Sequence, residues 1–180
     1  MDLEGTLFEL RGGQGSLSRL APCDTERMSE ITVGPGGGDH IAIRVLRRMH
    51  PQANDYWDGN WVDAEVVVDI RPWRASYRAY LRTDEFAQFR DQLRELYDGA
   101  RKEASFAPME PWLGLTLELD SLGHITLRGK AGPEGSGKIF GQVHLDFELK
   151  GVMDQTYLPP LIAQLDELER EFPVRGSPKD

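Results

Sequence analysis

The chain has 180 residues, 39% of them hydrophobic, and its 21 basic and 30 acidic residues give a net charge of −9 at pH 7. That length and hydrophobic content are sufficient for one ordinary core and exclude an intrinsically disordered chain. The negative balance disfavours direct binding to nucleic acid, because the phosphate backbone is also negative, and it is compatible with a basic protein partner.

Cysteine content and hydropathy set two further limits. Cys23 is the only cysteine, which excludes an internal disulfide. No hydrophobic run has the length that a membrane span requires, and residues 1–20 lack the apolar core of a secretion signal. We therefore expect a cytoplasmic protein that has no contact with a membrane.

Residues 1–40 are rich in glycine, serine and acidic residues, a composition typical of a flexible segment. We expect these residues to form a leader that contributes little to the core. Met28 opens the sequence MSEITV, an ordinary start for a small domain, so we hypothesise that the natural protein begins there.

Three strands are predicted next, at residues 41–46, 61–70 and 73–82, because hydrophobic side chains alternate in each run. The second and third runs are separated only by Arg71 and Pro72, which predicts an antiparallel hairpin. One face of this hairpin is apolar and the other is strongly charged.

The period then changes from two to that of a helix, which we expect to run from an N-cap at Thr83 to near Glu103. Acidic residues stand in the first turn, where the helix dipole favours negative charge. The apolar stripe, which we assign to core packing, consists of Phe86, Phe89, Leu93, Leu96 and Ala100.

Strand patterns resume over residues 113–120, 124–128 and 139–150, with a tight turn at 121–123, and predict a three-stranded meander. A second helix follows, with Pro173 as its stop and an apolar stripe of Leu158, Leu161, Leu165, Leu168 and Phe172. The predicted fold is therefore α+β, with one antiparallel sheet of about six strands and two amphipathic helices in the order β-β-β-α-β-β-β-α. We expect a single domain over residues 41–176 and a tail at 177–180.

Two motifs could indicate a nucleotide-binding or metal-binding site. GPEGSGK at residues 132–138 matches seven positions of a phosphate-binding loop, but Ile139 stands where the magnesium-binding hydroxyl is needed and a strand pattern follows, so we interpret it as a hairpin loop. His124 and His144 could meet on the polar face of the meander near Glu118 and Asp146. A metal-dependent enzyme at the two histidines is therefore an alternative, although their spacing favours an ordinary solvated face.

No nucleophilic triad can be assembled, and we predict neither catalytic residues nor a cofactor. A protein-binding role is better supported. Acidic side chains gather on the polar face of the second helix, and such a face can steer a basic partner; alternatively it only keeps the helix solvated. We predict that this face is the partner interface, with the residues Asp166, Glu167, Glu169 and Glu171.

Several local sequences resemble those of the WapI family of bacterial immunity proteins. They are DYWDGNW at 55–61, the aromatic helix at 86–97, residues 110–119 and the tail LDFELKGVMDQTYLPPLIAQLDELEREFPVRG at 145–176. The resemblance extends over residues 41–176. It implies a small cytoplasmic protein that binds and neutralises the toxic C-terminal domain of a secreted or contact-dependent toxin, often a nuclease.

We accordingly predict a non-enzymatic inhibitor that binds a basic toxin domain stoichiometrically. The alternative, besides the histidine site, is a self-associating scaffold that uses the same sheet.

Overall fold

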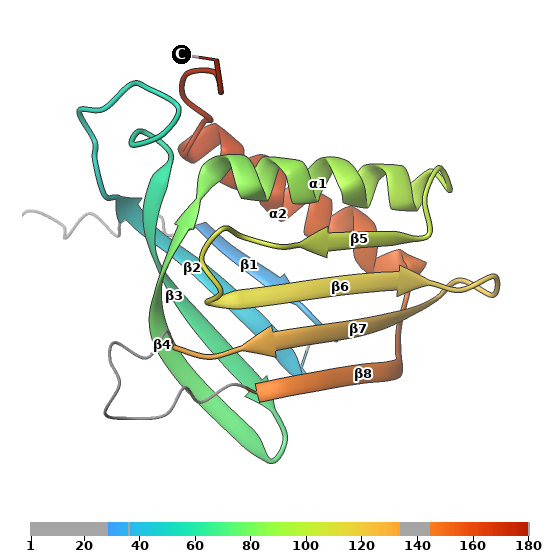
Figure 1. Ribbon diagram of the computed structural model, residues 1–180. Coiled ribbons are helices and arrows are strands. Elements are labelled where there is room, and N and C mark those ends of the chain that lie inside the picture. Colours follow the sequence, from blue (N-terminus) through green and yellow to red (C-terminus); the bar gives the residue numbers. More distant parts are fainter. Residues whose placement is uncertain (1–28, 36, 134–144, 180) are drawn as a thin grey trace, which may run out of the picture.

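The first half of the chain forms a four-stranded antiparallel sheet followed by a helix (Figure 1). In the computed structural model, residues 29–35, 37–133 and 145–179 are described. The first sheet has the order β1-β2-β3-β4 and the helix α1 follows directly. The elements are β1 (Ser29–Val33), β2 (His40–Arg48), β3 (Trp61–Ile70), β4 (Trp73–Arg82) and α1 (Thr83–Tyr97).

The second half repeats this arrangement. A four-stranded antiparallel sheet, in the order β5-β6-β7-β8, is followed by one turn of 3-10 helix at Gln155–Tyr157 and then by α2. The elements are β5 (Glu103–Phe106), β6 (Leu113–Leu119), β7 (His124–Ala131), β8 (Leu145–Asp154) and α2 (Leu158–Glu171).

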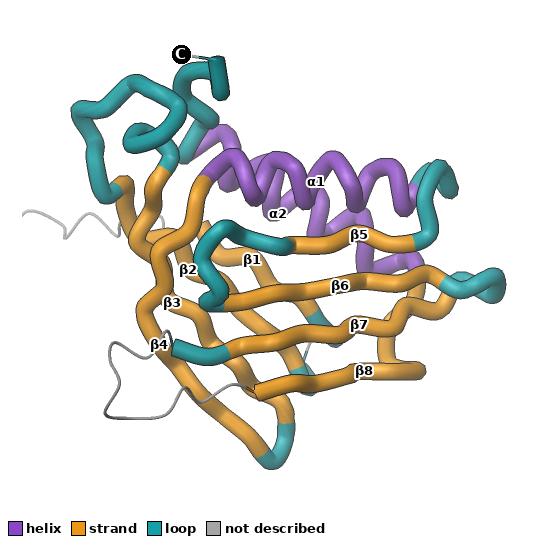
Figure 2. The backbone as a smooth tube through the Cα atoms, in the orientation of Figure 1, coloured by secondary structure: helices purple, strands orange, loops and turns teal. Residues whose placement is uncertain are grey.

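Each helix crosses from its own sheet to the first strand of the other. The helix α1 packs against β5, α2 packs against β1, and the two helices pack against each other. Figures 1 and 2 show the helices together along one side, with the two sheets below them. The predicted α+β class is confirmed, but the single sheet of about six strands is wrong: the strands divide into two sheets of four.

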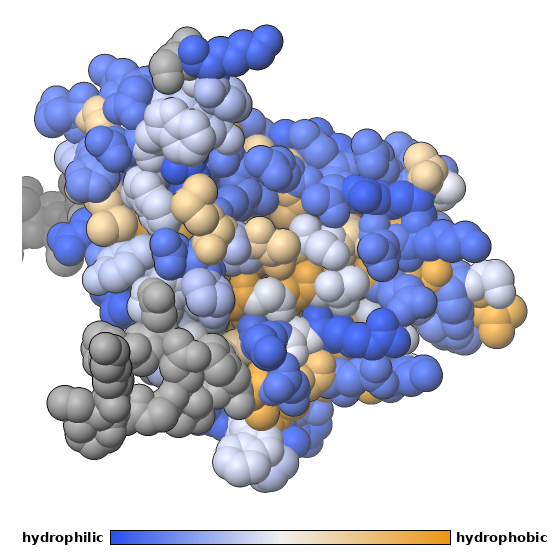
Figure 3. Space-filling view, in the orientation of Figure 1, coloured by the Kyte–Doolittle hydropathy of each residue, from blue (hydrophilic) through white to orange (hydrophobic). Residues whose placement is uncertain are grey.

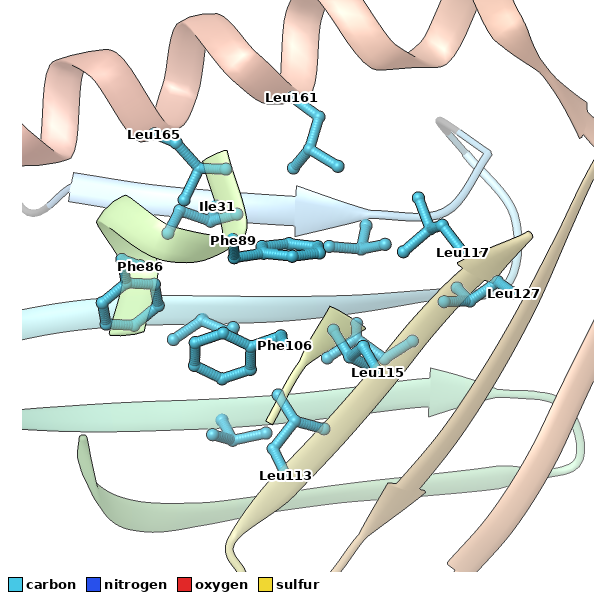
Figure 4. Packing of buried hydrophobic residues seen from close by; sticks show 14 of the residues in the cluster. Ile31, Phe86, Phe89, Phe106, Leu113, Leu115, Leu117, Leu127, Leu161 and Leu165 are labelled. Atoms are coloured by element: carbon cyan, nitrogen blue, oxygen red, sulfur yellow. The ribbon is translucent and has the colours of Figure 1, made fainter. Parts of the chain in front are cut away.

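One hydrophobic cluster joins both sheets and both helices. At its centre the ring of Phe106 stacks on Phe86, with centroids 5.0 Å apart, and lies 5.7 Å from Phe89. Figure 4 shows these rings between Leu165 of α2 and Leu113 of β6. The predicted stripe of α2 is confirmed for its four leucines at 158, 161, 165 and 168, which are all buried, whereas Phe172 is the C-cap and is only partly buried.

Two short strands were not predicted. The strand β1 has five residues and places Ile31 and Val33 in the core, so the expectation that residues 1–40 add little to the core is wrong for 29–33. The strand β5 has four residues and begins at Glu103, where the helix was predicted to end. The helix α1 stops at Tyr97 because the chain turns at Gly99, which has a left-handed φ of 75°. Residues 1–28, including the hypothesised start at Met28, lie outside the described residues.

The predicted hairpin is confirmed, with β3 and β4 paired antiparallel from Trp61 with Arg82 to Ile70 with Trp73. The predicted meander is confirmed in the order β6-β7-β8, although the part of its last strand before Leu145 lies outside the described residues.

The hydroxyl of Tyr77 links the edge strand β4 to the second sheet. It donates to the carbonyl of Trp112 at 2.6 Å and accepts from the amide of Gly132 at 3.1 Å. Burial raises the pKa of Tyr77 to about 12, so the hydroxyl stays protonated and able to donate at all ordinary pH values.

Candidate partner-binding surfaces

The two helices form an acidic layer. Eight carboxylate side chains and three arginines lie on α1 and α2 together. The acidic residues predicted as the interface lie on α2, but two of them are already engaged by α1. Asp166 pairs with Arg94 at 2.7 Å and with Arg90 at 3.6 Å, and Glu169 also pairs with Arg90.

The other two predicted residues have different surroundings. Glu167 pairs with Arg170 at 2.6 Å within the same helix, and both side chains are exposed. Glu171 accepts a hydrogen bond from the hydroxyl of Ser29 in β1. Asp166 and Glu169 therefore contribute to helix packing, whereas Glu167 is the member whose charge can be changed with the smallest effect on the fold. The interface role of all four stays a prediction.

The outward face of the first sheet presents the opposite charge. The central strand β3 supplies carboxylates and its neighbours β2 and β4 supply arginines, in the pairs Arg47–Asp63, Arg78–Asp63, Arg44–Glu65 and Arg74–Asp69. The side chain of Asp63 is 7% exposed, but Arg47 above it is 75% exposed. In each of these pairs the arginine is more exposed than the carboxylate, so guanidinium groups dominate the accessible surface that the pairs form.

Hydrogen bonds tie Glu65 and Asp63 to the side chains around them. Ser76 donates its hydroxyl to Glu65 at 2.6 Å, and this bond, followed by the one from Arg44, holds the pKa of Glu65 below its usual value. Arg78 donates to both oxygens of Asp63, from Nε at 2.9 Å and from a terminal nitrogen. The arginines are thereby fixed in place along the sheet.

A hollow of about 460 Å³ opens at one end of this charged face. Its walls are aromatic and apolar with two polar side chains. They come from the residues after β2, the start of β3, β4 and the loop before β6: Met49, His50, Trp61, Tyr80, Glu110 and Trp112. Tyr80 meets Trp112 edge to face with centroids 5.7 Å apart. The indole nitrogen of Trp112 is buried and has no hydrogen-bond partner among the described residues. We call this site the aromatic hollow.

The loop that carries Trp112 is tied to α1. Glu85 accepts from the amide of Met109 at 2.7 Å and from the amide of Arg82 at 2.9 Å. Burial nevertheless raises the pKa of Glu85. One carboxyl group thus holds both the start of α1 and one wall of the aromatic hollow.

The opposite wall depends on a buried polar network around Asn60, which is fully buried. Its amide nitrogen donates to the carbonyls of Tyr56 and Arg175, each at 2.9 Å. Its side-chain oxygen accepts from the hydroxyl of Thr83 and from the amide of Arg175, each at 2.8 Å. Thr83 was predicted as an N-cap, but its hydroxyl is used here, and Arg82 occupies the cap position.

Arg82 is the second member of this network that the sequence did not reveal. Its guanidinium group pairs with Asp84 at 3.0 Å and donates to the carbonyls of Tyr56 and Trp57, each at 2.9 Å. It also lies 5.5 Å from the centroid of the Trp61 ring. A hydrogen bond to Asp84 at 2.7 Å raises the pKa of Tyr56, which completes the cluster. A buried charge that is paired and hydrogen-bonded through all three of its nitrogens fixes the loop before β3.

A second hollow, of about 420 Å³, lies over the outward face of the other sheet. Ser105, Gly114, Thr116 and Gly129 are among the residues that line it. Hydrophobic atoms show over β5 to β7 in Figure 3, surrounded by hydrophilic side chains. The arginine and acidic residues there pair with one another, as Arg128 does with Glu118 at 2.7 Å and with Glu148 at 2.8 Å.

The histidine site is not assembled as expected. His124 pairs in register with Asp154, whereas Asp146 pairs with Lys130 at the other end of β7, roughly 20 Å away for six residues of strand. His124 instead contacts Asp120 at 3.2 Å, and Glu118 is held by Arg128. His144 and residues 134–138 of the glycine-rich motif lie outside the described residues. Within the described part of the chain, no three histidine, cysteine or acidic side chains are grouped to hold a metal ion.

A comparison with protein-family models identifies the family of the chain. The immunity protein WapI-like family matches residues 32–173, which include both sheets and both helices except for the first residues of β1. The chain belongs to this family. The suspected resemblance is thus confirmed.

No curated protein matches the chain. A solved structure entitled "Crystal structures of trypanosoma bruciei MRP1/MRP2" is similar over 81% of this chain and 87% of that one, with 11% identity and a TM-score of 0.37. No helix among the described residues of this WapI-like protein is long and apolar enough to cross a membrane.

We predict that Asn60→Ala lowers the free energy of unfolding by about 3 kcal/mol, because it leaves several buried donors and acceptors without partners. Asn54→Ala is the matched control: it changes an exposed asparagine of the same loop and should alter stability by less than about 0.5 kcal/mol. Urea denaturation followed by tryptophan fluorescence measures both values. Equal stabilities for the two variants would contradict the structural role of Asn60.

Proposed function

We propose that this protein neutralises a toxin domain by binding it stoichiometrically in the cytoplasm, with no chemical turnover of its own. The observation that carries the proposal is the match to the immunity protein WapI-like family over residues 32–173. The family name itself describes immunity proteins, and protection against a toxin requires that the toxin be recognised and blocked.

The ordered loops around the aromatic hollow support binding by a preformed site. Arg82, Asn60 and Glu85 fix the loops around the aromatic hollow through buried hydrogen bonds. Loops that are ordered before association lose less conformational entropy when a partner binds. A tight complex can therefore form without refolding of the inhibitor.

The acidic helix layer supports a basic partner. Eight carboxylates against three arginines leave α1 and α2 with a negative balance even after the interhelical ion pairs form. Such a layer attracts a basic domain at long range and raises the rate of association. In this proposal, Glu167 is the carboxylate of α2 whose charge is most accessible to an approaching partner.

A titration of toxin activity tests the function. A candidate basic toxin domain is mixed with increasing amounts of the purified full chain, and the residual toxic activity is measured. We expect activity to fall linearly and to vanish at one equivalent, with a complex of 1:1 mass by light scattering. Loss of activity at a small fraction of one equivalent would indicate an enzyme that modifies the toxin, and unchanged activity at excess would contradict the proposal.

Charge reversal at Glu167 tests the acidic layer. We expect Glu167→Lys to slow association with a basic toxin domain about two- to five-fold at low salt, with the difference lost at high salt. Glu148→Lys is the matched control, because its side chain is 46% exposed against 49% for Glu167 and it is also paired with one arginine. Stopped-flow fluorescence gives the rates, and equal rates for both variants would show that the acidic layer does not steer the partner.

A further inference from the structure

The aromatic hollow and the arginines of the first sheet form one continuous surface. Tyr80 in the wall of the hollow pairs in register with Asp63, the carboxylate that lies beneath Arg47 and Arg78. Beyond the end of β2, Met49 follows Arg47 by two residues, and its amide donates to the carbonyl of Trp61 at 3.0 Å. Guanidinium groups therefore flank the hollow on both β2 and β4.

The hollow has the chemistry of an anchor site. Its walls combine Trp61, Trp112 and Tyr80 with Met49, and tryptophan, tyrosine and methionine are enriched where protein partners meet. Tyr80 and Met49 are 42% and 39% exposed, so apolar area is available at the rim. Exposed Met109 and Trp57 lie on the two loops that border the hollow. A bulky apolar side chain of a partner would gain most by entering here.

The charge around the hollow indicates which polar group a partner would carry beside its apolar side chain. Asp63 is covered, whereas Arg47 and Arg78 above it are 75% and 55% exposed. An arginine has five donor groups in a planar fork, so these two retain donors beyond those that face Asp63. Carboxylates fit such exposed forks with charge-assisted hydrogen bonds.

We infer that this surface binds a segment of a protein partner in which a bulky apolar side chain stands beside an aspartate or glutamate. The apolar side chain enters the aromatic hollow and the carboxylate bonds to Arg47 and Arg78. The inference rests on the proposed function, since it names the contact surface through which the toxin domain is held. The acidic helix layer then attracts the partner at long range, and this surface makes the contacts that hold it.

Nucleic acid is the other class of ligand that carries negative charge and flat apolar groups. The net charge of −9 repels an extended phosphate backbone, because phosphates beyond the arginine cluster would meet the acidic surface. A short carboxylate-bearing segment meets only the local positive charge. Protein is therefore the class that the charge distribution favours.

Peptide selection tests the inference without any knowledge of the toxin. A library of random displayed 12-residue peptides is selected on the immobilised full chain, and the enriched peptides are synthesised and their affinities measured by fluorescence anisotropy. We expect an enriched pattern with Trp, Phe, Leu or Met beside Asp or Glu. Failure of the toxin titration leaves this result intact, so the two proposals fail separately.

Two pairs of variants give the contrast. Tyr80→Ser and Arg47→Gln should each weaken the peptides by about ten-fold. Their matched controls, Tyr97→Ser and Arg170→Gln, change side chains of similar exposure, 45% and 70%, and should leave binding unchanged. Circular dichroism melting confirms that each variant is folded.

Three outcomes would overturn the inference. They are the absence of enrichment, enrichment of basic peptides, and equal affinity for Tyr80→Ser and Tyr97→Ser. A fluorescein-labelled 20-nucleotide single strand of DNA is the competing probe, and binding of it that Arg47→Gln weakens would assign the surface to nucleic acid instead.

Discussion

The hydrogen bonds of one buried asparagine hold together three segments that are distant in the sequence. Asn60 joins the loop before β3, the start of α1 and the backbone of Arg175 after α2. Gly176 permits this approach, because its φ is 64° and a side chain there would meet the backbone of Tyr56. The start of β3 and the loop before it, which form one side of the aromatic hollow, are therefore placed by a polar contact and not by apolar burial alone.

Burial also decides which charge each surface shows. In the first sheet the carboxylates of β3 are paired with arginines from both neighbouring strands, and Asp63 is covered. In the helix layer the order is reversed, because Arg90 is 10% exposed and the acids around it lie outside. A protein with a net charge of −9 thus presents guanidinium groups on one face and carboxylates on another. Net charge alone predicts the second surface and misses the first.

The periodicity of hydrophobic residues predicted the long elements of the fold. The hairpin of β3 and β4 and the leucine stripe of α2 follow from runs of ten or more residues. The strands β1 and β5 are too short for a period of two to be distinguished. Alternation also indicates which face is buried but not which strand is the neighbour, so the division into two sheets was missed. The roles of Asn60 and Arg82 were not predicted, because residues of a buried polar network do not recur at a regular spacing in the sequence. The acids Asp84 and Glu85 beside Arg82 were the only sequence feature used above that pointed to a charged cluster there.

Hydrogen–deuterium exchange of the full chain, free and bound to its toxin domain, tests the central claim of a preformed contact surface most directly. We expect the amides of Thr83 and Arg175, bonded at Asn60, to exchange slowly even in the free chain. New protection on binding should be confined to residues 47–50, 61–63, 74–80 and 109–112. Rapid exchange around Asn60 in the free chain, or new protection centred on α2 alone, would contradict the account.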